Sequence, residues 1–247
     1  MKTQLNLFFL ALGFFSRIPM PAWVDYSPEK LNHSSRYLTL VGWFLGALVA
    51  IVFFCAEKIF PATISLWLAM GFSLLLTGAF HEDGLADTAD GFGGAFAREK
   101  KLQIMKDSRI GTYGATALLM TLLGKYLLLI ENSDIMLALL IAYPLSRATA
   151  VSLIADMSYV SDTDTSKSKP LASHMRMSDL AILLLTALPA FLFLSLEETA
   201  VVFASLLLVR TLAKLYLHKQ IGGYTGDTLG AVQQVSELCI YGVLLAL

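Results

Sequence analysis

The chain has 247 residues, of which 56% are hydrophobic and 15% are charged. Soluble domains carry about 25% charged residues, and their apolar share of roughly 45–50% already includes glycine. This composition excludes soluble globular, disordered and nucleic-acid-binding proteins. The 18 basic and 19 acidic residues leave a net charge of −1, so the overall charge predicts no polyanionic partner.

The first apolar stretch, residues 5–15, is too short to cross a membrane. No small-residue cleavage site follows it, because the next residues are Ser16-Arg17-Ile18-Pro19. We therefore expect a short interfacial or re-entrant helix at the N-terminus rather than a signal peptide.

Seven further apolar stretches are candidates for membrane spans, since a helix needs about 20 apolar residues to cross roughly 30 Å of hydrocarbon. A backbone in lipid must satisfy its own hydrogen bonds, and the alternation of barrel strands is absent, so we expect helices. The predicted fold is an all-α, polytopic membrane bundle of about seven transmembrane helices, forming one domain over residues 1–247. The expected spans are residues 37–56, 62–80, 112–130, 135–155, 180–196, 199–217 and 229–247.

The placement of lysine and arginine orients this bundle. With the N-terminus in the cytoplasm, most of the 18 basic residues face inside, and only Lys58 faces outside. The longer polar loops, residues 81–111, 156–179 and 218–228, then all face the cytoplasm. Any chemistry is therefore expected on that face.

An acidic motif, HEDGLADTADG at residues 81–91, follows the second span. If the segment is helical, Asp83, Asp87 and Asp90 share one face, where like charges repel. Mg²⁺ would neutralise them, because it binds one or two carboxylates and completes its shell with water and substrate phosphates. The alternative is a solvated acidic turn that caps the span. His81 is either an acid–base group or an interfacial polar residue.

A second motif, KDSRIGTYG at residues 106–114, leads into the third span. Its free N–H groups, its glycines and the helix dipole suit a phosphate, with Gly111 allowing close approach. Arg109 is able to clamp a phosphate at two points. The alternative is a helix cap with ordinary cytoplasmic positive charge.

A third motif, GGYTGDTLG at residues 222–230, opens the last span. Gly223, Thr225 and Asp227 are candidate substrate-binding residues in this loop. Asp227 or Thr228 is a plausible N-cap, so functional and capping roles both remain open.

Charged residues inside spans are costly unless they are paired. Glu237 lies two to three turns into the last span, and Arg147, Arg210 and Lys214 are its natural partners in a polar cleft open to the cytoplasm. For Lys214, snorkelling to the membrane surface is an equal alternative. For Lys125, near the outer end of its span, we expect snorkelling.

Together these features predict Mg²⁺-assisted phosphoryl or nucleotidyl transfer. A hydroxyl group of the second substrate would attack in line, and a carboxylate or His81 would take its proton. A site in a membrane implies a substrate that is large, amphipathic or lipid-linked.

The motifs resemble those of the bacterial cobalamin synthase family, whose activity is that of an adenosylcobinamide-GDP ribazoletransferase. The resemblance covers nearly the whole chain. Glu82 is a departure, since we expect an apolar residue at this position in many members. The matching segments are HEDGLADTADG (81–91), MKDSRIGTYG (105–114), PLSR (144–147), GGYTGDTLGA (222–231), FFSRIP (14–19) and LVGWFLG (40–46).

This resemblance implies a bacterial inner-membrane enzyme with Mg²⁺ as cofactor. It would join adenosylcobinamide-GDP to α-ribazole or its 5′-phosphate, giving adenosylcobalamin or its phosphate and releasing GMP. Asp83, Asp87 and Asp90 would then be metal and diphosphate residues. Asp107 and Arg109 would bind phosphate or a second metal, and Asp227 would belong to the same site.

Three other functions compete with this interpretation. A CDP-alcohol phosphotransferase has a looser match to the acidic motif and would release CMP from a CDP-lipid. A membrane transporter would need charged groups along the full depth of the membrane. A non-catalytic scaffold would not depend on the aspartates.

Overall fold

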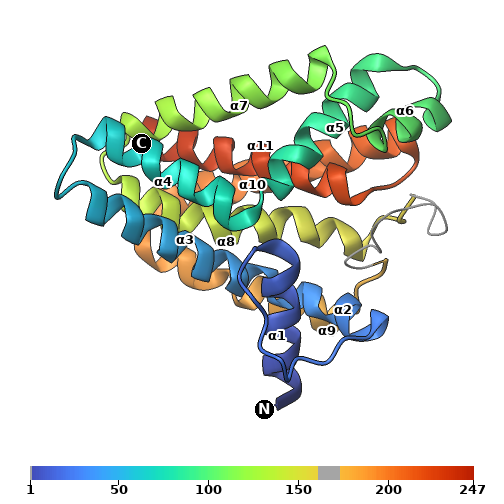
Figure 1. The fold of residues 1–247 in the computed structure, drawn as a ribbon, viewed down its shortest axis with the longest axis horizontal. Coiled ribbons are helices and arrows are strands. Elements are labelled where there is room, and N and C mark those ends of the chain that lie inside the picture. Colours follow the sequence, from blue (N-terminus) through green and yellow to red (C-terminus); the bar gives the residue numbers. More distant parts are fainter. Residues whose placement is uncertain (1, 161–172) are drawn as a thin grey trace.

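The computed structural model of the chain describes residues 2–160 and 173–247 and confirms the all-α fold (Figure 1). Within these residues, extended pairing is limited to one isolated bridge between Tyr159 and Tyr224. The helices in chain order are α1 (Lys2–Phe15), α2 (Pro28–Ser34), η1 (Ser35–Tyr37), α3 (Leu38–Ala56), α4 (Ala62–Thr77), α5 (Phe80–Gly94), α6 (Arg98–Met105), α7 (Thr112–Ile130), α8 (Ile135–Ser152), η2 (Leu153–Ala155), α9 (Met177–Leu185), η3 (Leu188–Phe193), α10 (Leu196–Ile221) and α11 (Gly226–Ala246).

Five helical segments in the described part are long and apolar enough to cross a membrane, and the bent pair of α4 and α5 makes a sixth. The chain is therefore a multi-pass membrane protein, with a span count close to the expected seven. The stretch expected to span at residues 180–196 is shorter and broken, because α9 ends at Leu185 and η3 follows. Pro189 lies in the first turn of η3, where it lacks the N–H that would continue an α-helix.

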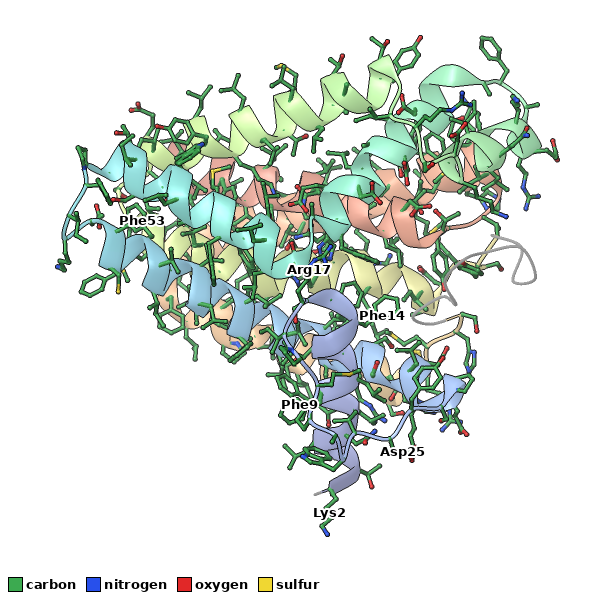
Figure 2. All side chains as sticks on the ribbon, viewed as in Figure 1. Lys2, Phe9, Phe14, Arg17, Asp25 and Phe53 are labelled. Atoms are coloured by element: carbon green, nitrogen blue, oxygen red, sulfur yellow. The ribbon has the colours of Figure 1, made fainter. Side chains whose placement is uncertain are left out.

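The short N-terminal helix is also present as predicted. In Figure 1, α1 stands across the direction of the long helices. The side chain of Asn6 bonds the backbone N–H and carbonyl of Asp25, at 2.7 and 2.9 Å, so the following segment folds back along α1 (Figure 2).

The C-terminal end of α1 supports a sharp corner between α4 and α5. The two helices meet at 83°, because Gly78 and Ala79 have positive φ angles of 66° and 55°. The Arg17 N–H donates to the carbonyl of Leu76 at 2.8 Å, and the Arg17 side chain covers Gly78 (Figure 2). Beyond this corner, α5 carries the acidic motif.

The polar loops differ from the prediction. The segment 81–111 was expected to be a loop but forms most of α5 and all of α6. Half of the expected loop 156–179, residues 161–172, lies outside the described residues, and its last residues, from Met177, belong to α9. The loop expected at 218–228 narrows to residues 222–225, because α10 runs to Ile221 and α11 begins at Gly226.

Helices α3 and α8 pack closely through two glycines on α3. A Cβ atom added to Gly42 would come within 2.7 Å of the Tyr143 carbonyl oxygen and the Pro144 Cα, and one on Gly46 within 3.0 Å of the Tyr143 Cβ. Small residues at this spacing let two membrane helices approach, which compensates for the missing hydrophobic driving force in lipid.

We expect Gly42→Ala to destabilise the protein by about 1–3 kcal/mol, because the added methyl group overpacks the α3–α8 contact. The thermal unfolding midpoint in detergent measures this loss. Gly71→Ala is the matched control, because a Cβ atom at Gly71 would meet nothing within 4 Å. An equal effect of both variants would show that helix propensity, not packing, sets the response.

Candidate active site

Helix α5 crosses α11 at two glycines, which brings the acidic motif against the third glycine-rich loop. A Cβ atom on Gly84 would come within 2.8 Å of the Asp227 carbonyl oxygen, and one on Gly230 within 3.2 Å of the His81 carbonyl oxygen. The backbones are therefore nearly in contact. This crossing lies at the end of the bundle that holds α6 and the starts of α7 and α11, here called the loop end (Figure 1).

Three carboxylates gather at this crossing, and we call Asp83, Asp87 and Asp227 the acidic cluster. Asp83 is exposed, whereas Asp87 and Asp227 are half-buried. Asp87 interacts electrostatically with both of the others, and Asp83 interacts with Asp227. Across residues 2–160 and 173–247, none of the three forms an ion pair. Among the described residues, therefore, no ion pair compensates the negative charge of the cluster.

Asp90 is used differently. Its carboxylate accepts hydrogen bonds from the backbone N–H groups of Gly111 at 2.7 Å and Gly114 at 2.8 Å, at the start of α7. A carboxylate is favourable there, because these N–H groups have no partner within the helix and the helix dipole is positive at this end. Asp90 thus engages the amides that were expected to bind a phosphate at Gly111.

The expected metal triad of Asp83, Asp87 and Asp90 is therefore not gathered at one point. In the described part of the chain, no group of three or more His, Cys, Asp or Glu side chains is placed to hold a metal ion. Mg²⁺ needs only one or two carboxylates when water and phosphate supply the rest. The acidic cluster fits that donor requirement, whereas Asp90 accepts a backbone hydrogen bond at each oxygen, which ties its carboxylate to the start of α7.

Asp107 and Arg109 form an exposed pair in the loop before α7. The Arg109 side chain is 87% exposed, and its Nη2 lies 2.7 Å from Asp107 Oδ2. The hydrogen bonds from Arg109 lower the pKa of Asp107 to about 2. Exposed ion pairs contribute little to stability, so Arg109 is free to exchange this partner for a phosphate.

In the third loop, Gly223 and Thr225 have structural roles. The carbonyl of Ser158 lies so close to Gly223 that a side chain would collide with it, and it accepts the Tyr224 N–H at 2.9 Å. Thr225, rather than Asp227 or Thr228, is the N-cap of α11, and it exchanges hydrogen bonds with Thr228 in a capping box. Capping by Thr225 leaves the Asp227 carboxylate to the acidic cluster.

The three cations expected to line one cleft do not meet. Arg210 and Lys214 both bind Asp156, at 2.9 and 2.8 Å. Partial burial opposes ionisation of Asp156, but the hydrogen bonds from Lys214 and Arg210 outweigh it and lower its pKa. Arg147 lies elsewhere, 3% exposed, with Nη1 3.6 Å from Glu237. The pairing of Arg147 with Glu237 agrees with the prediction, whereas Arg210 and Lys214 pair with Asp156 instead.

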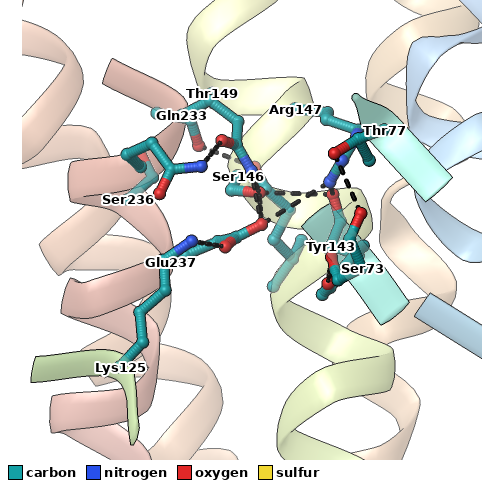
Figure 3. Close-up of polar contacts among 12 residues, drawn as sticks. Ser73, Thr77, Lys125, Tyr143, Ser146, Arg147, Thr149, Gln233, Ser236 and Glu237 are labelled. Carbon is teal, nitrogen blue, oxygen red and sulfur yellow. Dashed lines mark hydrogen bonds and ion pairs between the residues drawn. The ribbon is translucent and has the colours of Figure 1, made fainter. Parts of the chain in front are cut away.

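We expected Lys125 to snorkel to the membrane surface. Instead, its side chain is buried inside the bundle. Its Nζ lies 2.5 Å from Glu237 Oε2 (Figure 3). The same Nζ lies 3.9 Å from Glu82 Oε1. We call Glu82, Lys125, Arg147 and Glu237 the buried charge network. Its two acids and two bases balance, which removes most of the cost of placing charge in a membrane.

A signal for Lys125 was present in the sequence. The buried residues of α7 are Gly114, Thr121, Lys125 and Leu129, which recur every four or seven residues and so share one helical face. The small and polar members of this face mark it as facing protein rather than lipid.

His81 is buried and faces aromatic rings. Its imidazole stacks on Phe15, with ring centroids 5.5 Å apart and planes at 16°, and Phe80 packs edge-on at 5.6 Å. This position does not favour proton transfer by His81 at the acidic cluster.

The fold and the site define a polytopic membrane protein with a carboxylate-lined site at the loop end of a helical bundle. A family model described as "Cobalamin-5-phosphate synthase" matches residues 7–245. The chain belongs to this family, and it is an enzyme of the transferase class.

The chain resembles full-length relatives from several bacteria. A protein of Vibrio cholerae named adenosylcobinamide-GDP ribazoletransferase is 53% identical over 249 residues, covering 100% of this chain and 95% of its own. Proteins with the same name from Vibrio parahaemolyticus and Shewanella frigidimarina are 53% and 52% identical. They cover 100% and 98% of this chain, and 94% and 95% of their own lengths. No solved structure matches the chain.

We expect Asp90→Asn and Asp87→Asn to differ in stability. The amide introduced by Asp90→Asn keeps one acceptor oxygen for two backbone N–H groups, so this variant should lose about 1–3 kcal/mol. Asp87→Asn removes repulsion within the acidic cluster, so its stability should stay the same or rise. Thermal unfolding in detergent without divalent cations measures both. Equal losses would contradict the separate roles assigned to these aspartates.

Proposed function

We propose that the protein joins adenosylcobinamide-GDP to α-ribazole, or to its 5′-phosphate, in the late assembly of cobalamin. The products are adenosylcobalamin, or its phosphate, and GMP. The names of the relatives support this proposal, since they match along the whole chain at more than half identity. The structural observation that carries it is the acidic cluster, three carboxylates without an ion pair in the described residues, at the crossing of α5 and α11.

In the proposed reaction, a hydroxyl oxygen of the ribazole forms a bond to the phosphorus that carries the corrinoid. The bond from this phosphorus to the oxygen bridging the two phosphates breaks, and GMP leaves with the electron pair. The hydroxyl proton passes to a base. A half-buried carboxylate of the acidic cluster suits this task better than His81, which is enclosed by aromatic rings.

One or two carboxylates of the acidic cluster (Asp83, Asp87 and Asp227) would hold Mg²⁺ together with the diphosphate of the donor. When bound, the ion neutralises charge on the diphosphate and on the departing GMP. Arg109 would bind a phosphate oxygen from the exposed side of the site. Asp90 contributes by fixing the start of α7. The contacts of Arg147, Arg210, Lys214, Gly223 and Thr225 support structural rather than substrate-binding roles.

We also propose that the protein lies in the bacterial inner membrane with its N-terminus and its loop end in the cytoplasm. The predicted orientation puts most basic residues on that side. Both substrates are charged or polar, so a site facing the cytoplasm receives them without a membrane crossing.

We expect Asp83→Asn and Asp87→Asn each to lower Mg²⁺-dependent GMP release by about a hundredfold or more, because a charge that stabilises the transition state is removed. The assay combines purified protein, adenosylcobinamide-GDP and α-ribazole, with and without Mg²⁺, and measures GMP. Glu99→Gln, an exposed acid on α6, is the matched control and should retain activity.

Two results would reject the proposal, one from an assay of nucleotide release and one from a transport measurement. Release of CMP from a CDP-lipid, with no GMP from the corrinoid donor, would favour a CDP-alcohol phosphotransferase. Solute flux into liposomes that persists in Asp87→Asn would favour a transporter.

We expect Arg109→Ala to raise the KM for adenosylcobinamide-GDP by about tenfold or more while kcat changes less, because a charge-assisted contact contributes about 1.5–3 kcal/mol. Steady-state kinetics with varied donor measure this. Lys100→Ala removes an exposed positive charge from α6 and serves as the control. Unchanged kinetics of Arg109→Ala would exclude the phosphate clamp.

A further inference from the structure

Helix α5 carries four acidic residues that divide into two kinds. Asp90, near its end, bonds the start of α7. Glu82, in its first turn, accepts a hydrogen bond from Gln234 of α11 at 2.9 Å. Between them, Asp83 and Asp87 form no ion pair within the described residues. Two carboxylates thus attach the helix to its neighbours, and two belong to the acidic cluster.

Glu82 lies in a setting that tolerates few alternatives. It is 8% exposed, and Lys125 of α7 approaches its bonded oxygen to 3.9 Å. Lys125 in turn is held by Glu237 of α11. A buried charge that loses its partner is strongly destabilising, so the network selects one arrangement of α5, α7 and α11.

The contact of α5 with α11 at their closest approach does not by itself fix the rotation of α5. Its closest approach to α11 is made by Gly84 and Gly230, which have no side chains to interlock. Rotation of α5 about its axis would turn Asp83 away from Asp227. All side chains of a helix turn together, and Glu82 and Asp83 point about 100° apart on it. The residue next to Asp83 is Glu82, and its bonds oppose such a rotation.

We propose that Glu82 is a positioning residue, which holds the first turn of α5 through Gln234 and Lys125 and thereby directs Asp83 and Asp87 toward Asp227. Asp90 holds the other end of the same helix. The effect of Glu82 on catalysis rests on the proposed function. Its effect on the position of α5 is independent of that function.

Two substitutions of Glu82 separate positioning from charge. Glu82→Gln keeps an amide oxygen that accepts the hydrogen bond from Gln234. The other carboxylate oxygen, Oε2, has no hydrogen-bond partner among the described residues, so its replacement by an NH₂ group breaks no hydrogen bond. Glu82→Leu is similar in size but accepts no hydrogen bond. We expect Glu82→Leu to lower kcat by about tenfold or more, with little change in KM for the donor, because misplaced groups slow the chemical step. Glu82→Gln should stay within about threefold of wild type.

Gln234→Leu tests the same bond from α11. It should lower kcat, and the double variant should lose no more than Glu82→Leu alone, because Glu82→Leu already removes the bond to Gln234. Full additivity of the two losses would overturn the proposal.

Ser146→Ala is the matched control within the same polar region. Its hydroxyl lies 3.4 Å from Glu237 and 3.1 Å from Gln233, without bonding α5. We expect near-normal kcat even if the unfolding temperature falls. A loss of kcat in Ser146→Ala equal to that in Glu82→Leu would show that activity follows general stability, and it would overturn the proposal.

Hydrogen–deuterium exchange of the backbone amides of residues 83–90, in the full chain in detergent, measures how firmly α5 is held. It does not depend on catalytic activity. We expect exchange to be about tenfold faster in Glu82→Leu and unchanged in Ser146→Ala. If the wild-type protein releases no GMP, the proposed function fails and this exchange alone decides the positioning role. Exchange in Glu82→Leu equal to wild type would reject that role.

Discussion

The near-contact of the α5 and α11 backbones at Gly84 and Gly230 is the constraint on which the candidate site depends. Asp227 lies in the first turn of α11, and Asp83 and Asp87 lie one turn or less from Gly84, so the crossing brings the three carboxylates into the same region. A side chain at Gly84 would push against the backbone of Asp227 and move the two helices apart. The repulsion among the three carboxylates explains why a cation or a cation-bound substrate suits the site.

The acidic motif illustrates how one run of similar residues serves different purposes. Asp90 caps α7, Glu82 joins a buried charge network, and Asp83 and Asp87 stay available for chemistry. These roles follow from which neighbour each side chain meets as α5 turns. Spacing along the helix predicted the shared face but not the neighbours.

The interior of the bundle shows how a membrane protein places charge far from water. Lys125 and Arg147 come from α7 and α8, and both bind Glu237 of α11 (Figure 3). Each charge has an opposite partner, so none has to reach the surface. The same bonds tie together the helices that carry the candidate site, and stability and function are therefore linked in this chain.

Sequence alone determined the helical membrane fold, the short first helix and the three segments that meet at the loop end, because hydropathy and glycine-rich motifs are local properties. It did not determine that residues 81–94 are helical rather than a loop, that Asp90 occupies the amides of α7, or that Lys125 is buried. Those outcomes depend on contacts between helices distant in the chain. A charged side chain in the membrane needs an opposite charge nearby, because exposure to lipid costs free energy. Only the packing of the helices decides which opposite charge lies within reach.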